Sequence, residues 1–277
     1  MLSVSDHSRD SVGLKYIYPV VSRRAGGVSI GINLNVNNAC NWRCVYCQVP
    51  GLTRGGPPPV DLGLLESELR RLLSDIVLGD FLERNAPEEA RRLVDLAFSG
   101  NGEPTSSADF LAAVESVARV MREFALPEGV LLRLITNGSF MHRPVVQQAV
   151  AHIGSQRGEV WFKLDAATES SIATINGIRV SVDKVRASIL ACAERAPTWI
   201  QTCCFAIDGK ELSQADQSAY LELISKVGEK IKGVLLYGLA RPSMQPEAGR
   251  LSNIARDRLY QFADCIAALG IRVVANP

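Results

Sequence analysis

The run Cys40-Asn41-Trp42-Arg43-Cys44-Val45-Tyr46-Cys47 contains three cysteines in the spacing C-x3-C-x2-C. Three thiolates in one loop could hold three irons of a cubane iron–sulfur cluster and leave the fourth iron open to a ligand, whereas four cysteines would close the cluster for electron transfer. The cysteines could also fill a core or hold a structural zinc ion. Zinc would need a fourth ligand, and no further Cys or His lies close by in sequence. The run therefore favours an iron–sulfur site.

The composition is typical of one large globular domain. The chain has 277 residues, of which 47% are hydrophobic, and an α/β barrel is commonly this long as a single domain. With 30 Lys and Arg against 29 Asp and Glu, no global field attracts nucleic acid or a membrane. Residues 1–60 are locally basic through residues such as Arg9, Arg23 and Arg24. This excess could meet an anionic substrate or balance an anionic thiolate-bound cluster.

Neither secretion nor membrane insertion is indicated. The N-terminus is polar and has no signal-peptide apolar block, and no stretch of 18 uninterrupted apolar residues occurs. Seven cysteines, an odd number, do not suggest a secreted disulfide framework. We expect a cytoplasmic protein with no membrane partner.

Apolar runs of strand type alternate with helical patterns along the chain. Expected strands cover residues 28–34, 93–98, 130–135, 160–164, 199–207, 234–239 and 271–274. Expected helices cover residues 61–78, with Asp61 as the cap, 107–124, a segment from about 144, 182–195, 213–229 and 256–269. This alternation predicts an α/β fold: a partial or full parallel (β/α) barrel of about six βα units. We expect one domain over residues 1–277, with residues 1–25 as an N-terminal extension.

In such folds, ligands gather at the carboxyl ends of the strands. The second expected strand ends in Gly100-Asn101-Gly102-Glu103. Its glycines would let the backbone approach a ligand closely, and Glu103 would put an acidic group at the rim. The third ends in Asn137-Gly138, which by itself is an ordinary turn signal.

The fourth expected strand carries Lys163 and Asp165, which alternate onto one face. An outward, solvated pair is one alternative, but a parallel strand of this kind is buried on both faces. A buried Lys–Asp pair is costly unless it binds something polar. We therefore expect both side chains to point into the barrel at the active site.

Two further features have structural or functional interpretations. Arg241 follows the sixth expected strand and could contact an anion or form a salt bridge at the rim. The remaining cysteines are expected to be small apolar core residues; they are Cys192, Cys203, Cys204 and Cys265.

Together these motifs resemble those of the radical S-adenosylmethionine (radical SAM) superfamily, with Tyr46 as the aromatic residue before the last cysteine. The resemblance implies a [4Fe–4S] cluster on the three cysteines, with SAM bound at the open iron. Reductive cleavage of SAM would give a 5′-deoxyadenosyl radical that removes a hydrogen atom. Glu103 would contact the SAM amino group and Asn137 its ribose or carboxylate. The implied cofactor-binding residues are Tyr46, Gly100, Gly102, Glu103, Asn137 and Arg241, and Lys163 and Asp165 would be catalytic.

Several segments are similar to one branch of the superfamily, the one that includes tRNA 4-demethylwyosine synthase. They include residues 19–24, 30–33 and 163–166. The wyosine enzymes hold a second cluster on cysteines that precede the SAM motif, whereas no cysteine precedes Cys40 here. The resemblance also implies an electron donor such as flavodoxin or ferredoxin.

The substrate stays open, as a small molecule, a peptide or an RNA. The leading hypothesis is a single-cluster radical SAM enzyme. The alternatives are an activase of glycyl-radical enzymes, a tRNA-modifying enzyme, and a non-catalytic electron carrier or SAM-binding protein.

Overall fold

The computed structural model describes residue 2 and residues 12–22 and 25–277. Arg9, Arg23 and Arg24 of the basic N-terminal stretch lie outside the described residues. Within the described part of the chain, none of the helices has the length and apolar character that crossing a bilayer requires.

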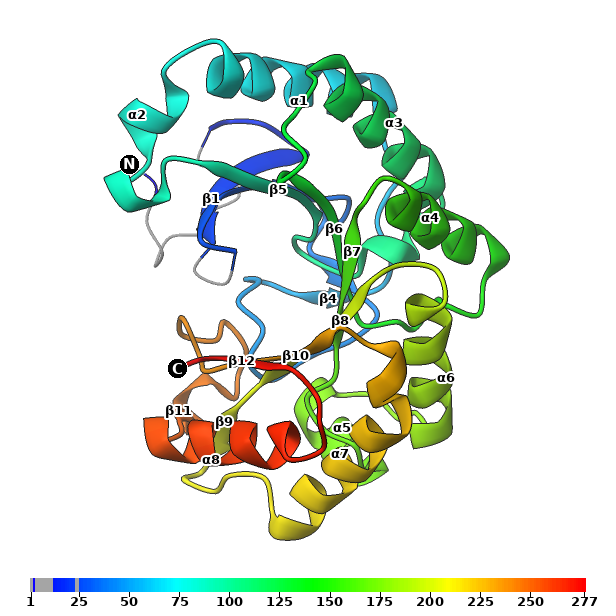
Figure 1. Ribbon diagram of the computed structural model, residues 1–277, viewed down its shortest axis with the longest axis vertical. Helices are drawn as coiled ribbons and strands as arrows, with labels where there is room; N and C mark the ends of the chain where they lie inside the picture. Colours follow the sequence, from blue (N-terminus) through cyan, green and yellow to red (C-terminus); the bar gives the residue numbers. More distant parts are fainter. Residues whose placement is uncertain (1, 3–11, 23–24) are drawn as a thin grey trace.

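The main element is an eight-stranded sheet in the order β1-β2-β5-β6-β7-β8-β10-β12. The β1 strand is antiparallel to β2, and all other neighbours are parallel. Figure 1 shows that the sheet curls into a partial barrel, which confirms the predicted fold class in its partial form. Its strands are β1 (Ile17–Ser22), β2 (Gly27–Ile32), β5 (Leu93–Phe98), β6 (Leu131–Thr136), β7 (Glu159–Lys163), β8 (Thr198–Cys203), β10 (Gly233–Tyr237) and β12 (Val273–Asn276).

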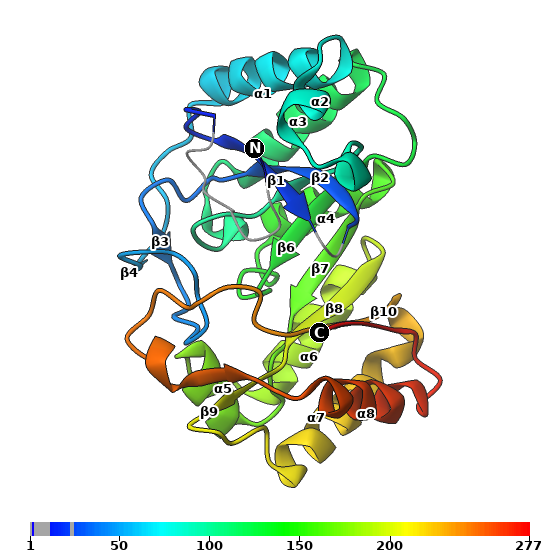
Figure 2. The same cartoon turned by 90° about the vertical axis from the view of Figure 1, so that its left-hand side faces the viewer.

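Two short pairs supplement the sheet: β3 (Ala39–Cys40) with β4 (Thr53–Arg54), and β9 (Phe205–Ile207) with β11 (Leu251–Asn253). The helices lie along the outer side of the curved sheet, as Figures 1 and 2 show. They are α1 (Leu62–Val77), α2 (Phe81–Asn85), α3 (Phe110–Glu123), α4 (Pro144–Ser155), α5 (Glu169–Asn176), α6 (Val182–Ala193), α7 (Gln214–Val227) and α8 (Arg256–Ala267). The predicted cap of α1 is present, since Asp61 accepts a hydrogen bond from the backbone N–H of Leu64 at 3.0 Å.

Alternation along the strands separates the core from the interior of the barrel. On β6, Leu132 and Leu134 are fully buried in the core between sheet and helices, whereas Arg133 and Ile135 line a cavity on the concave face. Because successive side chains point to opposite faces, the strands β5, β6, β7 and β8 each contribute to both environments. The strands therefore carry polar side chains into the barrel without breaking the core.

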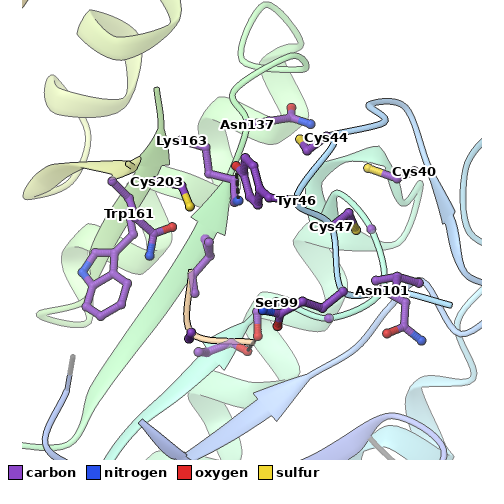
Figure 3. Close-up of a pocket in the computed structure, with 18 of the residues that line it drawn as sticks. Cys40, Cys44, Tyr46, Cys47, Ser99, Asn101, Asn137, Trp161, Lys163 and Cys203 are labelled. Atoms are coloured by element: carbon purple, nitrogen blue, oxygen red, sulfur yellow. Dashed lines mark hydrogen bonds between the residues drawn. The ribbon is translucent and has the colours of Figure 1, made fainter. Parts of the chain in front are cut away.

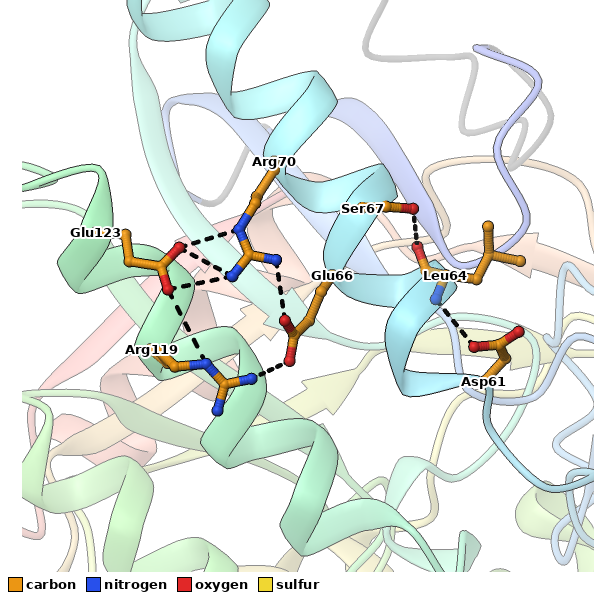
Figure 4. A network of polar contacts seen from close by, with 7 residues as sticks. All are labelled: Asp61, Leu64, Glu66, Ser67, Arg70, Arg119 and Glu123. Atoms are coloured by element: carbon orange, nitrogen blue, oxygen red, sulfur yellow. Dashed lines mark hydrogen bonds and ion pairs between the residues drawn. The ribbon is translucent and has the colours of Figure 1, made fainter.

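On the outer surface, α1 and α3 are joined by an ionic network (Figure 4). Arg70 bridges Glu66 and Glu123, each at 2.9 Å, and Arg119 also contacts Glu66. The arginines and Glu123 are 38–50% exposed, so each pair contributes at most about 1 kcal/mol. The network lies far from the concave face and orients two helices.

Three elements differ from the prediction. The N-terminal extension is shorter than residues 1–25, because Ile17–Ser22 forms β1 in the main sheet. Pro19 is tolerated there because β1 is an edge strand. The strand expected over residues 199–207 is two strands, since β9 leaves the sheet to pair with β11; a continuous apolar run does not reveal a change of partner. The short helix α5 was not predicted.

Candidate functional site

A cavity of about 290 Å³ lies between the cysteine loop and the concave face of the sheet. Figure 3 shows side chains around it that come from several strands, from the cysteine loop and from the loop after β5. All of the site residues predicted from the sequence line this cavity, with the exception of Asp165. They are Cys40, Cys44, Tyr46, Cys47, Gly100, Gly102, Glu103, Asn137, Lys163 and Arg241.

The cysteine loop is held on one side by the C-terminal end of α5. The backbone N–H of Val45 donates to the carbonyl of Ile175 at 2.8 Å, and that of Arg43 donates to the carbonyl of Asn176 at 3.1 Å. These carbonyls belong to the last turn of the helix, where they lack partners within the helix. The helix end and the loop therefore satisfy each other's backbone groups.

On its other side, the cysteine loop is held by residues 241–247, which follow β10 and which we call the clamp segment. Ser243 Oγ donates to the carbonyl of Val45 at 2.7 Å, and the N–H of Met244 donates to the carbonyl of Cys47 at 2.9 Å. Gln245 Nε2 donates to that same Cys47 carbonyl at 3.3 Å. The backbone of the cysteine loop is thus held by hydrogen bonds on both sides.

Two of the three sulfur atoms accept hydrogen bonds. The Sγ of Cys40 accepts from the backbone N–H of Trp42 at 3.4 Å, and the Sγ of Cys44 accepts from Asn176 Nδ2 at 3.3 Å. Burial raises the pKa of Cys40 to about 11 and that of Cys44 to about 12. Both thiols are therefore protonated at neutral pH in the free protein, and a metal that binds them must displace those protons.

The donor set of the cysteine loop is compatible with an iron–sulfur cluster. Within the described ranges, no group of three or more Cys, His, Asp or Glu side chains could hold one metal ion together. The soft sulfur ligands, the hydrogen bonds to them and the adjoining cavity all suit an iron–sulfur cluster.

The two glycines of the loop after β5 are required by close packing. A Cβ on Gly100, whose φ is +138°, would lie 2.4 Å from Asn33 Oδ1, and a Cβ on Gly102 would lie 2.2 Å from the carbonyl oxygen of Ala39. Residue 33 follows β2, and Ala39 opens the cysteine loop. The glycines thus let the loop after β5 pack against the cysteine loop, in addition to lining the cavity.

Glu103 does not stand at an exposed rim, as the sequence suggested, because its side chain is only 3% exposed. Its carboxylate accepts from Thr105 Oγ1 at 2.5 Å, from Thr136 Oγ1 at 2.6 Å and from the N–H of Asn137 at 2.7 Å. Burial raises its pKa, against the effect of these donors. Glu103 thereby ties the end of β6, including Asn137, to the loop after β5.

Asn137 itself is oriented toward the cysteine loop. Its Nδ2 donates to Asn41 Oδ1 at 3.0 Å, and its Oδ1 accepts from the N–H of Ser139 at 3.0 Å. Asn137 lines the same cavity as Cys44, and Figure 3 labels both side chains. The predicted strand-end asparagine therefore lies at the cavity, next to the candidate cluster ligands.

Lys163 and Asp165 are linked through Tyr46. Lys163 lines the cavity, and its Nζ donates to the Tyr46 hydroxyl at 3.0 Å. That hydroxyl in turn donates to Asp165 Oδ2 at 2.6 Å. Asp165 lies behind Tyr46 and also accepts from Asn176 Nδ2 and from the N–H of Cys203. The expectation that both charged groups open into the cavity therefore holds for Lys163 alone, because protein donors occupy the carboxylate of Asp165.

The electrostatics of this trio favour a charged lysine. Burial lowers the pKa of Lys163, but the negative charge of neighbours such as Asp165 outweighs it, so the pKa lies above its ordinary value. The pKa of Tyr46 is also raised, by burial and by Asp165. At neutral pH the cavity therefore contains an ammonium beside a neutral phenol.

The floor of the cavity is a buried ionic cluster that was not predicted from the sequence. Arg133 on β6 binds Asp95 on β5 and Glu159 on β7, the latter at 2.7 Å. Its guanidinium lies 4.2 Å from the centre of the Trp161 ring. The sequence does contain a signal for this cluster, because its charged residues lie on otherwise apolar strands and alternate onto the same face as Lys163.

The other four cysteines differ in placement. Cys192 and Cys204 are buried in the core, as expected. Cys203 is also buried but lines the cavity, and Cys265 is exposed on α8, so the core prediction is wrong for Cys265. Residue 265 lies in the solvent-facing stripe of an amphipathic helix, where an apolar residue type alone does not define burial.

No protein-family model matches the chain. A UPF0026 protein of Helicobacter pylori strain J99 is 30% identical over 150 residues, a match that covers 53% of this chain and 41% of the relative. A UPF0026 protein of Methanocaldococcus jannaschii is 30% identical over 159 residues, covering 57% of this chain and 42% of the relative. The chain thus spans about two fifths of the length of these curated relatives.

Solved structures give broader similarity. A structure of TYW1 with a lysine–pyruvate adduct bound has a TM-score of 0.57 at 15% identity, covering 88% of this chain and 74% of that one. A radical SAM methyltransferase from Sphaerobacter thermophilus has a TM-score of 0.59 at 14% identity, covering 93% and 67%. These comparisons confirm, at the level of the fold, the resemblance predicted from the sequence. The chain has the fold of radical SAM enzymes.

Proposed function

We propose that this protein is a radical SAM enzyme. Cys40, Cys44 and Cys47 would hold one [4Fe–4S] cluster, and SAM would bind at the iron without a cysteine ligand. One observation carries the proposal: the three cysteines line the same cavity as the glycine loop after β5 and the charged Lys163. A purely structural metal site would leave no ligand cavity beside it.

The bound cluster and SAM would supply one-electron cleavage of the S–C5′ bond, which gives methionine and a 5′-deoxyadenosyl radical for hydrogen abstraction. The role of the chain's own residues would be to bind and orient SAM. Gly100 and Gly102 would let SAM approach the backbone, and Asn137 and Arg241 would contact its polar groups. Tyr46 would border the cofactor, while Glu103 acts as a positioning residue beneath Asn137.

Lys163 would serve the reaction as a fixed positive charge on the β7 wall of the cavity. Its ammonium is held by Tyr46, which Asp165 orients through a 2.6 Å hydrogen bond. Asp165 therefore acts through Tyr46 as a positioning residue. A small electron carrier such as flavodoxin or ferredoxin would reduce the cluster.

The decisive experiment is turnover of SAM. Protein reconstituted anaerobically with iron and sulfide, then reduced with dithionite, should convert SAM to 5′-deoxyadenosine and methionine, quantified by liquid chromatography. A non-catalytic electron carrier or SAM-binding protein would give neither product. That result would remove the proposal.

Matched cysteine variants provide the control. Cys44→Ala should abolish 5′-deoxyadenosine, because it removes a proposed cluster ligand. Cys265→Ala, which changes an exposed cysteine on α8, should leave the rate unchanged. Equal rates in both variants would show that the product arises without the proposed site.

A further inference from the structure

Gln201 carries a polar group that the protein itself does not satisfy. Its side chain lines the cavity from β8 and is 1% exposed. Among the residues that the structure describes, its Nε2 has no hydrogen-bond partner. Buried donors are nearly always paired, because an unpaired one loses its hydration without compensation. This amide therefore points to an acceptor that comes from outside the chain.

Lys163 is the neighbour of Gln201 across the sheet. The parallel register of β7 and β8 aligns the two residues directly, and adjacent strands are about 4.8 Å apart. Only one of the three ammonium donors of Lys163 is used by Tyr46. The wall of the cavity thus presents a positive charge and a neutral donor side by side.

No comparable donor pair remains at the floor of the cavity. There Arg133 is bound by the carboxylates of Asp95 and Glu159, so its charge is already compensated. Arg241 of the clamp segment also lines the cavity, but the proposed function assigns it to SAM. An anionic group of the substrate would therefore be drawn to the β7–β8 wall. A carboxylate matches this wall best, since its two oxygens can accept from an ammonium and an amide at once.

Gln201 lies apart from the candidate cluster ligands, whereas Lys163 reaches the cysteine loop through Tyr46. Figure 3 shows Trp161 and Cys203 across the cavity from Cys40 and Asn101. Gln201 lies on the same strand and face as Cys203, two residues earlier. The cysteine loop and the glycine loop after β5 therefore border one side of the cavity, and Gln201 borders the other.

We propose that Gln201 and Lys163 form a subsite that binds the carboxylate of the substrate, and that the substrate is a small carboxylic acid. The proposal rests on the proposed function and deepens it by naming the substrate class. The cavity of about 290 Å³ would hold SAM as well as the substrate, so the room left at the β7–β8 wall suits only a small molecule. Trp161 supplies an aromatic wall for the non-polar part of such an acid.

Acetate is the probe for the test. Saturation-transfer NMR of the acetate methyl group gives its dissociation constant for the reconstituted protein at constant ionic strength. We expect binding in the millimolar range, weaker binding of the neutral isostere acetamide, and no binding of methylammonium. Acetamide that binds as well as acetate would overturn the assignment of a carboxylate.

Variants then locate the binding. Gln201→Leu removes the amide donor at similar size and should weaken acetate about tenfold or more. Gln201→Glu should abolish binding through repulsion, and it keeps the test valid if the leucine variant folds poorly. Gln261→Leu on the exposed face of α8 is the control and should bind as the wild type does. Unchanged affinity in both Gln201 variants would overturn the proposal.

Competition with SAM decides between two sources of the carboxylate. If the subsite serves the substrate, saturating SAM leaves acetate bound, and displacement by SAM would assign the site to the methionine carboxylate instead. Formation of 5′-deoxyadenosine is measured on the same preparations. Acetate binding without that product contradicts only the enzymatic function, and the product without Gln201-dependent acetate binding contradicts only the subsite.

Discussion

The side-chain amide of Asn176 donates a hydrogen bond to the sulfur of Cys44 at a distance of 3.3 Å. The same amide donates to Asp165 Oδ2 at 2.8 Å. One residue at the end of α5 therefore contacts both a candidate cluster ligand and the carboxylate that orients Tyr46. These two hydrogen bonds link the cysteine loop to the Lys163–Tyr46–Asp165 trio.

Asn176→Ala should make the midpoint potential of the cluster more negative. A hydrogen bond to a ligand sulfur stabilises the reduced, more negatively charged state. Its loss costs on the order of 1 kcal/mol, which is about 40 mV for one electron. Spectroelectrochemical titration measures the shift. Asn37→Ala changes an exposed residue near the start of the same loop and should leave the potential unchanged; a similar shift in both variants would contradict the role of the sulfur contact.

The iron content should follow three cysteines and no others. Reconstituted protein should hold about four irons and four sulfides per chain, because three thiolates hold one cubane. Alanine at Cys40, Cys44 or Cys47 should remove the visible absorption of the cluster, whereas alanine at Cys192 or Cys265 should retain it. Iron and sulfide assays check this result. A requirement for either of the last two would show that the ligand set is incorrect.

Gly102→Ala should destabilise the protein and reduce cluster loading. The new Cβ would lie 2.2 Å from the carbonyl oxygen of Ala39, so the cysteine loop must move. Overpacking of this kind costs about 1–3 kcal/mol, which denaturant unfolding can measure. Gly249→Ala is the matched control, because its Cβ would meet no atom within 4 Å. Equal stabilities would mean that the two loops do not pack as described.

Glu103→Gln should lower the free energy of unfolding. The amide NH₂ would face a donor, because both carboxylate oxygens accept hydrogen bonds from Thr105, Thr136 or Asn137. One unsatisfied buried donor costs about 1–3 kcal/mol. Urea titration measures the change, with Glu88→Gln at an exposed position as the control. A variant as stable as the wild type would show that the carboxylate is not structural.

Asp216→Asn should change how stability depends on pH. Asp216 accepts hydrogen bonds from Thr168 Oγ1 and Ser171 Oγ at the start of α5, and from Ser213 at the start of α7. Partial burial opposes its ionisation, but these donors outweigh it, so its pKa lies below the ordinary value. The stabilisation is therefore present above the unfolded pKa of about 3.9 and is lost as pH falls through the lower folded value.

Thermal unfolding at several pH values tests this linkage. The wild type should exceed Asp216→Asn in stability at pH 7, and the difference should shrink as the pH falls below about 4. Asp257→Asn, at an exposed position in the first turn of α8, should show no comparable difference. A difference that is constant from pH 3 to pH 7 would exclude the ionised carboxylate as its cause.

The sequence was sufficient for the alternating strands and helices and for the residues at strand ends, since periodicity and position along a parallel strand determine both. It placed Lys163 at the cavity for this reason. The prediction that Asp165 points into the cavity was wrong because neighbouring loops direct a residue just beyond the end of a strand. Here its carboxylate accepts hydrogen bonds from Tyr46, Asn176 and Cys203.

Asn176 could not be found because its helix is short and its partner, Cys44, lies more than 130 residues earlier. Gln201 carried no local signal either. A glutamine within an apolar strand becomes informative only when its unsatisfied amide is seen facing a cavity.

The clamp segment has a consequence for the biosynthesis of the protein. The cysteine loop leaves the ribosome before Ser243 and Gln245, which bind its carbonyls and are made roughly 200 residues later. At typical elongation rates this interval is about 10–40 s. During that time the three thiols have been made but lack the backbone contacts that fix the loop. Stable cluster insertion should therefore follow synthesis of the clamp segment, and a nascent protein stalled before residue 241 should retain little iron.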